Sequence, residues 1–200
     1  MELSIKSSLF DRHRKLLVDK AFIEFDDKDL NSASPTKFLK HEVDSFRFGI
    51  KWIRGYKFII GRIYCVDIKS VAGETIKIRL KSLYKVRRSQ LAAKYSKIIA
   101  ALYDNYFDDI TRSYLSDFDN AKEIQILGVT FCEDGVYLHN KKLLINWLDV
   151  GTKAYYTYYT IFSLSNPSNY RAFEYLKDWN TGILYGVSRR ILSDKGLYKK

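Results

Sequence analysis

The residues in this sequence that are best suited to chemistry are arginines and lysines gathered in short runs. The candidates are three runs, RHRK at 12–15, KVRR at 85–88 and SRR at 188–190 with the tail DKGLYKK at 194–200. The run at 85–88 directly precedes a segment with helical spacing, and cations beside the free N–H groups of a helix N-terminus can bind an anion. A solvated loop is the competing interpretation for this run. The anion-binding candidates are Lys85, Arg87, Arg88, Arg189 and Arg190.

The chain as a whole is basic, with 34 Lys and Arg against 23 Asp and Glu and a formal net charge of +11. Such a chain is attracted to nucleic acid and to anionic membrane surfaces. The stretch FRFGIKWIRGYKF (46–58) interleaves cations with aromatics, as nucleic-acid binding requires. An amphipathic strand pair with solvated basic residues has the same pattern, and we favour that interpretation. Trp52 and Arg54 are the candidates for a contact surface in this stretch.

A second aromatic stretch, KAYYTYYTIF (153–162), contains four tyrosines. Bulky residues occupy both parities, so this stretch is predicted to be one strand with two packed faces. A ligand platform is the alternative. If one face is left uncovered, Tyr155 and Tyr159 are the residues expected on a contact surface.

Signs of catalysis, metal binding or cofactor binding are weak. The three histidines lie far apart, and the sequence has no Cys-x-x-Cys pair, glycine-rich phosphate loop or nucleophile elbow. An enzyme would require Asp26, Asp27, Asp108 and Asp109 to converge in one pocket. These aspartates stand beside predicted turns and a helix end, where solvated carboxylates are common. We therefore predict a non-enzymatic protein without catalytic residues, metal or cofactor.

The composition is that of a folded protein with one large or two small domains, since 46% of the 200 residues are hydrophobic. No apolar run is long enough for a signal peptide or a membrane-spanning helix. Cys65 and Cys132 lie far apart and are expected to be free, buried thiols. A soluble cytoplasmic protein is the simplest expectation.

Hydrophobic periodicity predicts a set of strands and then a helix in each half of the chain. KFIIGRIYCVDIK (57–69) and TIKIRLKSL (75–83) alternate around the turn VAGET, which predicts a hairpin with one buried and one solvated face. In the second half, strands begin at EIQILGVTF (123–131), and NTGILYGVSRRIL (180–192) closes as a short helix. From Ser89 the spacing is helical, with the apolar stripe Leu91, Tyr95, Ile98, Ile99, Leu102 and Tyr106.

The two halves also share sequence detail. KFLKHEVDSFRFG (37–49) parallels KLLINWLDVGTKA (142–154). In both segments a basic residue and an apolar pair precede a polar step and then an aspartate, Asp44 or Asp149. Internal repetition on this scale indicates a duplicated supersecondary unit.

With these repeated steps and two amphipathic closing helices, the chain resembles bacterial pleckstrin-homology (PH)-like domains, present as two units in tandem. The resemblance implies the α+β class, each unit being a bent antiparallel sheet of about seven strands closed by a C-terminal helix. It covers residues 15–115 and 122–194. It places a first unit at 1–118, ending in a long helix, and a second, shorter unit at 119–200, ending in a short helix. PH domains that bind phosphoinositides carry basic residues around the first hairpin, whereas DDKDLNSASPT (26–36) is acidic and neutral.

The function predicted from the sequence is binding. The first hypothesis is an adaptor that docks another protein through its sheet edges and the groove beside its helix. Bacterial PH-like domains tend to self-assemble, so the resemblance also implies a homo-oligomer. The alternative is peripheral binding to an anionic membrane or to nucleic acid through the basic clusters. Nucleic acid is the partner that the sequence favours least.

Overall fold

A computed structural model describes residues 1–6, 11–27, 34–139 and 142–197 of the chain. The fold belongs to the α+β class, and the strand pairs within these ranges are antiparallel. The chain divides into two compact units, unit 1 (Met1–Phe107) and unit 2 (Asp108–Lys200).

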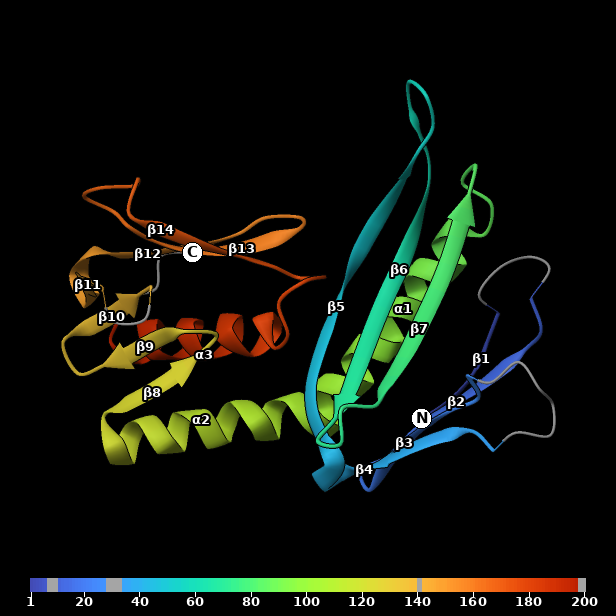
Figure 1. The fold of residues 1–200 in the computed structure, drawn as a ribbon, viewed down its shortest axis with the longest axis horizontal. Coiled ribbons are helices and arrows are strands. Elements are labelled where there is room, and N and C mark those ends of the chain that lie inside the picture. Colours follow the sequence, from blue (N-terminus) through green and yellow to red (C-terminus); the bar gives the residue numbers. More distant parts are fainter. Residues whose placement is uncertain (7–10, 28–33, 140–141, 198–200) are drawn as a thin grey trace. The chain divides into compact units, whose positions relative to one another are not determined.

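Unit 1 contains two antiparallel sheets and a closing helix (Figure 1). A 3-10 turn, η1 (Lys40–Glu42), separates a four-stranded meander from a three-stranded sheet. The helix α1 (Arg88–Leu102) contacts β6 and β7. The strands are β1 (Glu2–Ile5), β2 (Arg14–Val18), β3 (Phe22–Phe25), β4 (Thr36–Leu39), β5 (Val43–Arg54), β6 (Ile59–Ser70) and β7 (Thr75–Leu83).

Unit 2 repeats this order after an initial helix, α2 (Asp108–Ala121). A four-stranded sheet, the 3-10 turn η3 (Trp147–Asp149) and a three-stranded sheet precede the closing helix α3 (Thr181–Asp194). In each unit, two sheets that meet at a 3-10 turn take the place of the single bent sheet expected from the sequence. The strands are β8 (Glu123–Ile126), β9 (Val129–Cys132), β10 (Gly135–Leu138), β11 (Leu143–Asn146), β12 (Val150–Ala154), β13 (Tyr158–Ser163) and β14 (Tyr170–Glu174).

A matching backbone hydrogen bond aligns the two units at their 3-10 turns. At the 3-10 turns, the Val71 N–H donates to the Glu42 carbonyl and the Leu164 N–H donates to the Asp149 carbonyl, each at 2.8 Å. Asp149 therefore corresponds to Glu42, and its predicted correspondence with Asp44 is wrong by two residues. The sequence match relied on an apolar pair that includes Leu144, but that side chain is exposed.

The sheet β5–β6–β7 has one face in the core and one face toward solvent, which confirms the predicted hairpin of β6 and β7. On the solvent face, Asp67 is only 3% exposed, and its carboxylate pairs with Arg47 at 2.9 Å and Arg79 at 2.5 Å. A buried carboxylate requires such partners, because an unpaired charge there would be costly. The buried side chains of the core face include Phe46, Tyr64, Val66, Ile68, Ile76, Ile78 and Leu80.

The helix after β7 begins one residue before Ser89 and extends past Leu115, with a change of geometry in its middle. A π-helical turn, η2 (Tyr103–Phe107), follows α1 and leads into α2. The wider turn accommodates an extra residue, so the consecutive residues Tyr106 and Phe107 are both buried in unit 1. Beyond this turn, α2 contacts α3 and β8. The compact units therefore divide after Phe107, whereas the sequence placed the boundary after residue 118.

The stretch at 153–162 is a hairpin and not the single two-faced strand predicted from its tyrosines. β12 ends at Ala154, β13 begins at Tyr158, and the Tyr155 N–H closes the turn by donating to the Tyr158 carbonyl at 2.8 Å. The equivalent turn of unit 1 has the same bond, from the Gly55 N–H to the Phe58 carbonyl at 2.8 Å.

Candidate functional site

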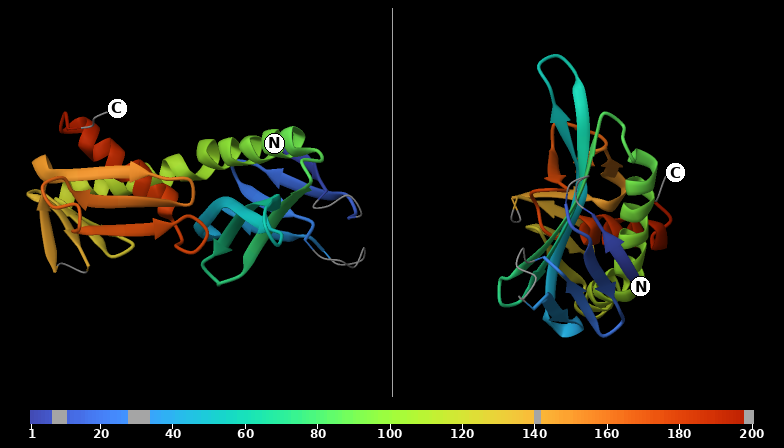
Figure 2. Two further views of the ribbon diagram at one scale, coloured as in Figure 1. Left: turned by 90° about the horizontal axis from the view of Figure 1, so that it is seen from above. Right: turned by 90° about the vertical axis from the view of Figure 1, so that its right-hand side faces the viewer.

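The tip of the β5–β6 hairpin projects beyond the end of β7 in unit 1 (Figures 1 and 2). The corner between β7 and α1 lies beside it, because the Tyr84 N–H donates to the Ile60 carbonyl at 2.8 Å. We call the side chains at this end of unit 1 the tip surface. Its exposed apolar members are Tyr56 (97% exposed), Tyr84 (70%), Phe58 (65%), Ile59 (55%) and Val86 (47%). Its basic members are Arg54, Lys57, Arg62, Lys85, Arg87 and Arg88.

The tip surface concentrates positive charge. Residues 54–62 carry three basic side chains and no acidic one, and residues 82–90 also carry three and none. The two segments together hold six positive charges, whereas the net charge of the whole chain is +11. Exposed apolar groups and unopposed cations therefore occupy the same end of unit 1.

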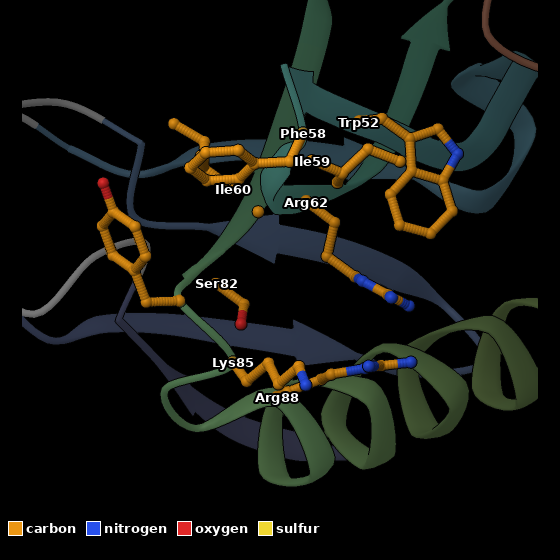
Figure 3. A pocket seen from close by; sticks show the side chains of 10 residues that line it. Trp52, Phe58, Ile59, Ile60, Arg62, Ser82, Lys85 and Arg88 are labelled. Carbon is orange, nitrogen blue, oxygen red and sulfur yellow. The ribbon is translucent and has the colours of Figure 1, made fainter. Parts of the chain in front are cut away.

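A pocket of about 510 Å³ opens within the tip surface (Figure 3). Phe58, Ile59 and Trp52 form an apolar part of its wall. The guanidinium carbon of Arg62 lies 4.4 Å from the centre of a Trp52 ring, a cation–π contact that orients this arginine. The full set of lining residues is Trp52, Phe58, Ile59, Ile60, Gly61, Arg62, Ser82, Tyr84, Lys85 and Arg88.

The corner that carries Lys85 into this pocket has an unusual backbone. Tyr84, Lys85 and Arg87 have φ angles of 48°, 64° and 55°, in the left-handed region that disfavours residues with a Cβ. Each such residue costs about 1 kcal/mol or more, which the surrounding structure must offset. The Ser82 hydroxyl helps to hold the corner by donating to the Val86 carbonyl at 3.0 Å. Strain of this kind is concentrated at functional sites in proteins.

The structure brings together part of the predicted set of site residues. Trp52, Lys85 and Arg88 line one pocket, and Arg87 is the N-cap residue of α1 beside it. Arg54 is exposed at the end of β5, near the tip. Arg62 also lines this pocket but is not among the residues predicted from the sequence.

Two candidates from the second half, Arg189 and Arg190, lie on α3 and engage neighbours within unit 2. Arg189 donates to the Tyr185 hydroxyl and lies over the Tyr185 ring. Arg190 pairs with Asp194 at 3.1 Å. Both arginines line a pocket of about 320 Å³ on α3, where two cations meet, against three in the pocket of unit 1.

The two tyrosines predicted on a contact surface differ in their exposure to solvent. Tyr155 is 41% exposed in the turn of its hairpin. Tyr159 is fully buried, and its hydroxyl lies 2.5 Å from the Ser188 hydroxyl of α3. Burial raises the pKa of Tyr159 to about 12. The prediction that Tyr159 forms part of a contact surface is therefore wrong, because α3 covers that face of β13.

Unit 2 has an apolar groove of about 320 Å³ beside the C-terminal end of α3. Leu148 and Leu164 are 83% and 48% exposed at its edge. Asp149 fixes this corner, and the hydroxyl hydrogen bond from Ser163 is the main reason that the pKa of Asp149 is lowered. The lining residues are Trp147, Leu148, Val150, Gly151, Thr152, Phe162, Leu164, Leu192, Gly196 and Leu197.

The aspartates considered for catalysis have structural partners or face solvent. Arg12 binds Asp26 through two hydrogen bonds of 2.6 and 2.7 Å, which lower the pKa of Asp26. Asp27 accepts a hydrogen bond from the Thr36 hydroxyl at 2.8 Å. Asp108 and Asp109 are exposed at the start of α2. Within the described ranges, no three His, Cys, Asp or Glu side chains gather as a metal site.

Two further observations concern the whole described part of the chain. Its helices are all too short or too polar to cross a membrane. Comparison with known proteins gives no match, since no protein-family model, curated protein or solved structure is significantly similar to the chain.

Proposed function

We propose that the chain is a non-enzymatic pair of PH-like units that docks onto anionic membrane surfaces through the tip surface of unit 1. The PH-like assignment is supported by the order of elements in each unit, four strands, a 3-10 turn, three strands and a closing helix. The cytoplasmic location expected from the sequence belongs to the same proposal, because anionic lipids give the cytoplasmic leaflet its negative surface potential.

The observation that carries this proposal is the coincidence of exposed apolar side chains with unopposed cations on the tip surface. A side chain such as Phe58 gains free energy on leaving water for the acyl boundary. Tyrosines are favoured at the membrane interface, where the ring is partly buried and the hydroxyl stays hydrated. Each cation near an anionic leaflet adds about 1 kcal/mol of attraction, which salt weakens.

Nucleic acid is supported less well by the same geometry. In β5, Phe46 packs in the core while Arg47, the next residue, points to the other face and pairs with Asp67. The first part of the interleaved pattern, residues 46–51, therefore separates into an aromatic inner face and a basic outer face, whereas from Trp52 onward aromatics and cations share the tip surface. A stacking platform needs both kinds of side chain on one surface.

The test is co-sedimentation with vesicles that contain phosphatidylserine and with vesicles of phosphatidylcholine alone. We expect binding to the first kind, weakening as salt is raised. Changing Lys85, Arg87 and Arg88 together to alanine removes three charges, which corresponds to a loss of affinity of roughly 100-fold.

The matched control changes Lys20, Lys77 and Lys97 to alanine. These three lysines are also exposed in unit 1, but they lie in the β2–β3 turn, in β7 opposite Asp67 and nine residues into α1, away from the tip. The control is expected to lose less than about tenfold, because its charges stay farther from the lipid than a Debye length. Equal losses in the two triple variants, or unchanged binding in the first, would contradict docking through the tip surface.

Docking of a protein partner is the second candidate, and the groove of unit 2 is the observation that favours it. Leu148, 83% exposed beside an apolar groove, is the kind of side chain that a partner would bury. The partner is either another protein, as in the adaptor hypothesis, or a second copy of this chain. Such a partner would slow hydrogen exchange around Leu148 and Leu164 and leave the tip surface unchanged.

A further inference from the structure

We propose that the pocket of the tip surface binds a phosphate monoester, so that unit 1 recognises a phosphate group and not negative charge alone. This inference rests on the proposed membrane docking and names the ligand of the same surface. A phosphate monoester carries between −1.5 and −2 charges near neutral pH and three strong acceptor oxygens, whereas the phosphodiester of an ordinary lipid carries a single charge.

Three cations reach this pocket from three separate segments of unit 1. Arg62 belongs to β6, Lys85 to the strained corner and Arg88 to the first turn of α1. Figure 3 shows the side chains of Arg62 and Arg88 extending in the same direction from opposite walls of the pocket. No lining residue is acidic, so the attraction between these cations and a dianion is unopposed.

The types of these cations suit phosphate. Guanidinium groups bind phosphate oxygens through two parallel hydrogen bonds, and the lysine ammonium adds a compact charge. Contact with the Trp52 ring restrains the guanidinium of Arg62 before any ligand arrives, which lowers the entropy lost on binding. The strained backbone at Lys85 fixes where its side chain leaves the corner.

The apolar half of the pocket fits a ligand with a phosphate at one end and lipid at the other. Phe58 and Ile59 form the exposed side of the wall. The volume of about 510 Å³ is many times the roughly 30 Å³ that one water molecule occupies in the liquid. A phosphate group with the glycerol that carries it therefore has room beside the three cations.

The competing explanation is diffuse attraction, in which each cation of the tip contributes equally to any anionic surface. Lys57 separates the two explanations, because it lies at the turn of the same hairpin but does not line the pocket. Diffuse attraction predicts the same loss for Lys57→Gln and Arg88→Gln. A phosphate pocket predicts a much larger loss for Arg88→Gln.

The experiment compares vesicles containing phosphatidic acid, a phosphate monoester, with phosphatidylserine vesicles matched in surface potential. We expect the wild-type chain to prefer phosphatidic acid. Arg88→Gln should lose about thirtyfold in affinity for phosphatidic acid and abolish the preference, while Lys57→Gln loses about fivefold and keeps it. Arg88→Lys, which restores the charge but not the paired hydrogen bonds, should recover part of the loss. Circular dichroism confirms that each variant is folded.

A second arm distinguishes a lipid head group from a free phosphate compound. Glycerol 3-phosphate is titrated into the chain by calorimetry, and binding that is lost in Arg88→Gln would support the pocket and show that it accepts the phosphate group without a membrane. If the chain binds vesicles with the expected preference for phosphatidic acid but does not bind glycerol 3-phosphate, the pocket is supported as a site for lipid.

The remaining outcomes overturn one proposal or both. Vesicle binding without preference for phosphatidic acid, or with equal losses in Lys57→Gln and Arg88→Gln, would overturn the pocket and leave membrane docking intact. Absence of vesicle binding would overturn the proposed function, and absence of glycerol 3-phosphate binding in addition would overturn the pocket as well.

Discussion

Replacing Phe58 and Ile59 together by serine is expected to lower the affinity of the protein for anionic vesicles by about 30- to 160-fold. The two side chains are 65% and 55% exposed in the free protein, so most of their apolar surface is available for transfer into the membrane. Transfer of two such side chains contributes roughly 2–3 kcal/mol, which corresponds to this change in the dissociation constant. Co-sedimentation with phosphatidylserine vesicles measures it.

This loss should persist at high salt, since burial of apolar surface is not screened by ions. Val71→Ser is the matched control, because Val71 is 69% exposed in the turn between β6 and β7, at the other end of β6 from the tip. The control should bind vesicles as the unchanged chain does. If the control loses as much as the double variant, or if the double variant loses nothing, insertion of the tip is wrong.

The second large effect is on stability, where Phe107→Ala is expected to lower the free energy of unfolding by about 3–5 kcal/mol. Phe107 is 1% exposed and stacks on Phe46 of β5, with the rings inclined by 11°. It also meets Tyr103 edge to face, with centroids 4.9 Å apart. Removal of the ring leaves a cavity where the π-helical turn joins the sheet. Unfolding by guanidinium chloride, followed by circular dichroism, measures the change.

Phe58→Ala is the control for Phe107→Ala, because it makes the same substitution at an exposed ring. Its stability should change by less than about 0.5 kcal/mol, as is usual for a surface position, while its vesicle binding falls. Phe107→Ala is therefore expected to lower stability, whereas Phe58→Ala is expected to lower vesicle binding. Similar losses of stability in the two variants would contradict the burial described for Phe107.

Regular periodicity made much of the fold predictable. The alternation of Ile76, Ile78 and Leu80 with lysines and arginine is reproduced by β7, whose apolar face is buried. The helical stripe from Leu91 to Tyr106 is also confirmed, since Leu91, Ile98, Leu102 and Tyr106 are buried. Both patterns follow from the two-residue and 3.6-residue periods of side chains on strands and helices.

Departures from regular structure account for the errors. The hairpin at 153–162 turns at Tyr155–Tyr158, without the glycine or asparagine that marks most tight turns. The π-helical turn adds one residue, which an ideal helical period does not anticipate. The sequence match used the apolar pair Leu143–Leu144. The buried residue of β11 is Ile145, which follows that pair, and the match therefore placed Asp149 opposite Asp44.

The candidate site was predictable only as a cluster of charges. Lys85 and Arg88 stand out in the sequence as part of one basic run. Their pairing with Arg62 and Trp52 depends on the hairpin bringing residues from β5 and β6 beside the start of α1, which sequence spacing does not reveal. The left-handed backbone at Tyr84 and Lys85 also has no local sequence signal, because neither residue is a usual choice for that conformation.

Hydrogen–deuterium exchange of the full chain, with and without phosphatidylserine vesicles, is the measurement that tests membrane docking through the tip surface most directly. We predict slower exchange at residues 54–62 and 83–88 when vesicles are present, and no change at residues 147–150 and 162–165. Vesicle binding without protection of the tip segments would contradict the proposal, as would protection confined to the groove of unit 2.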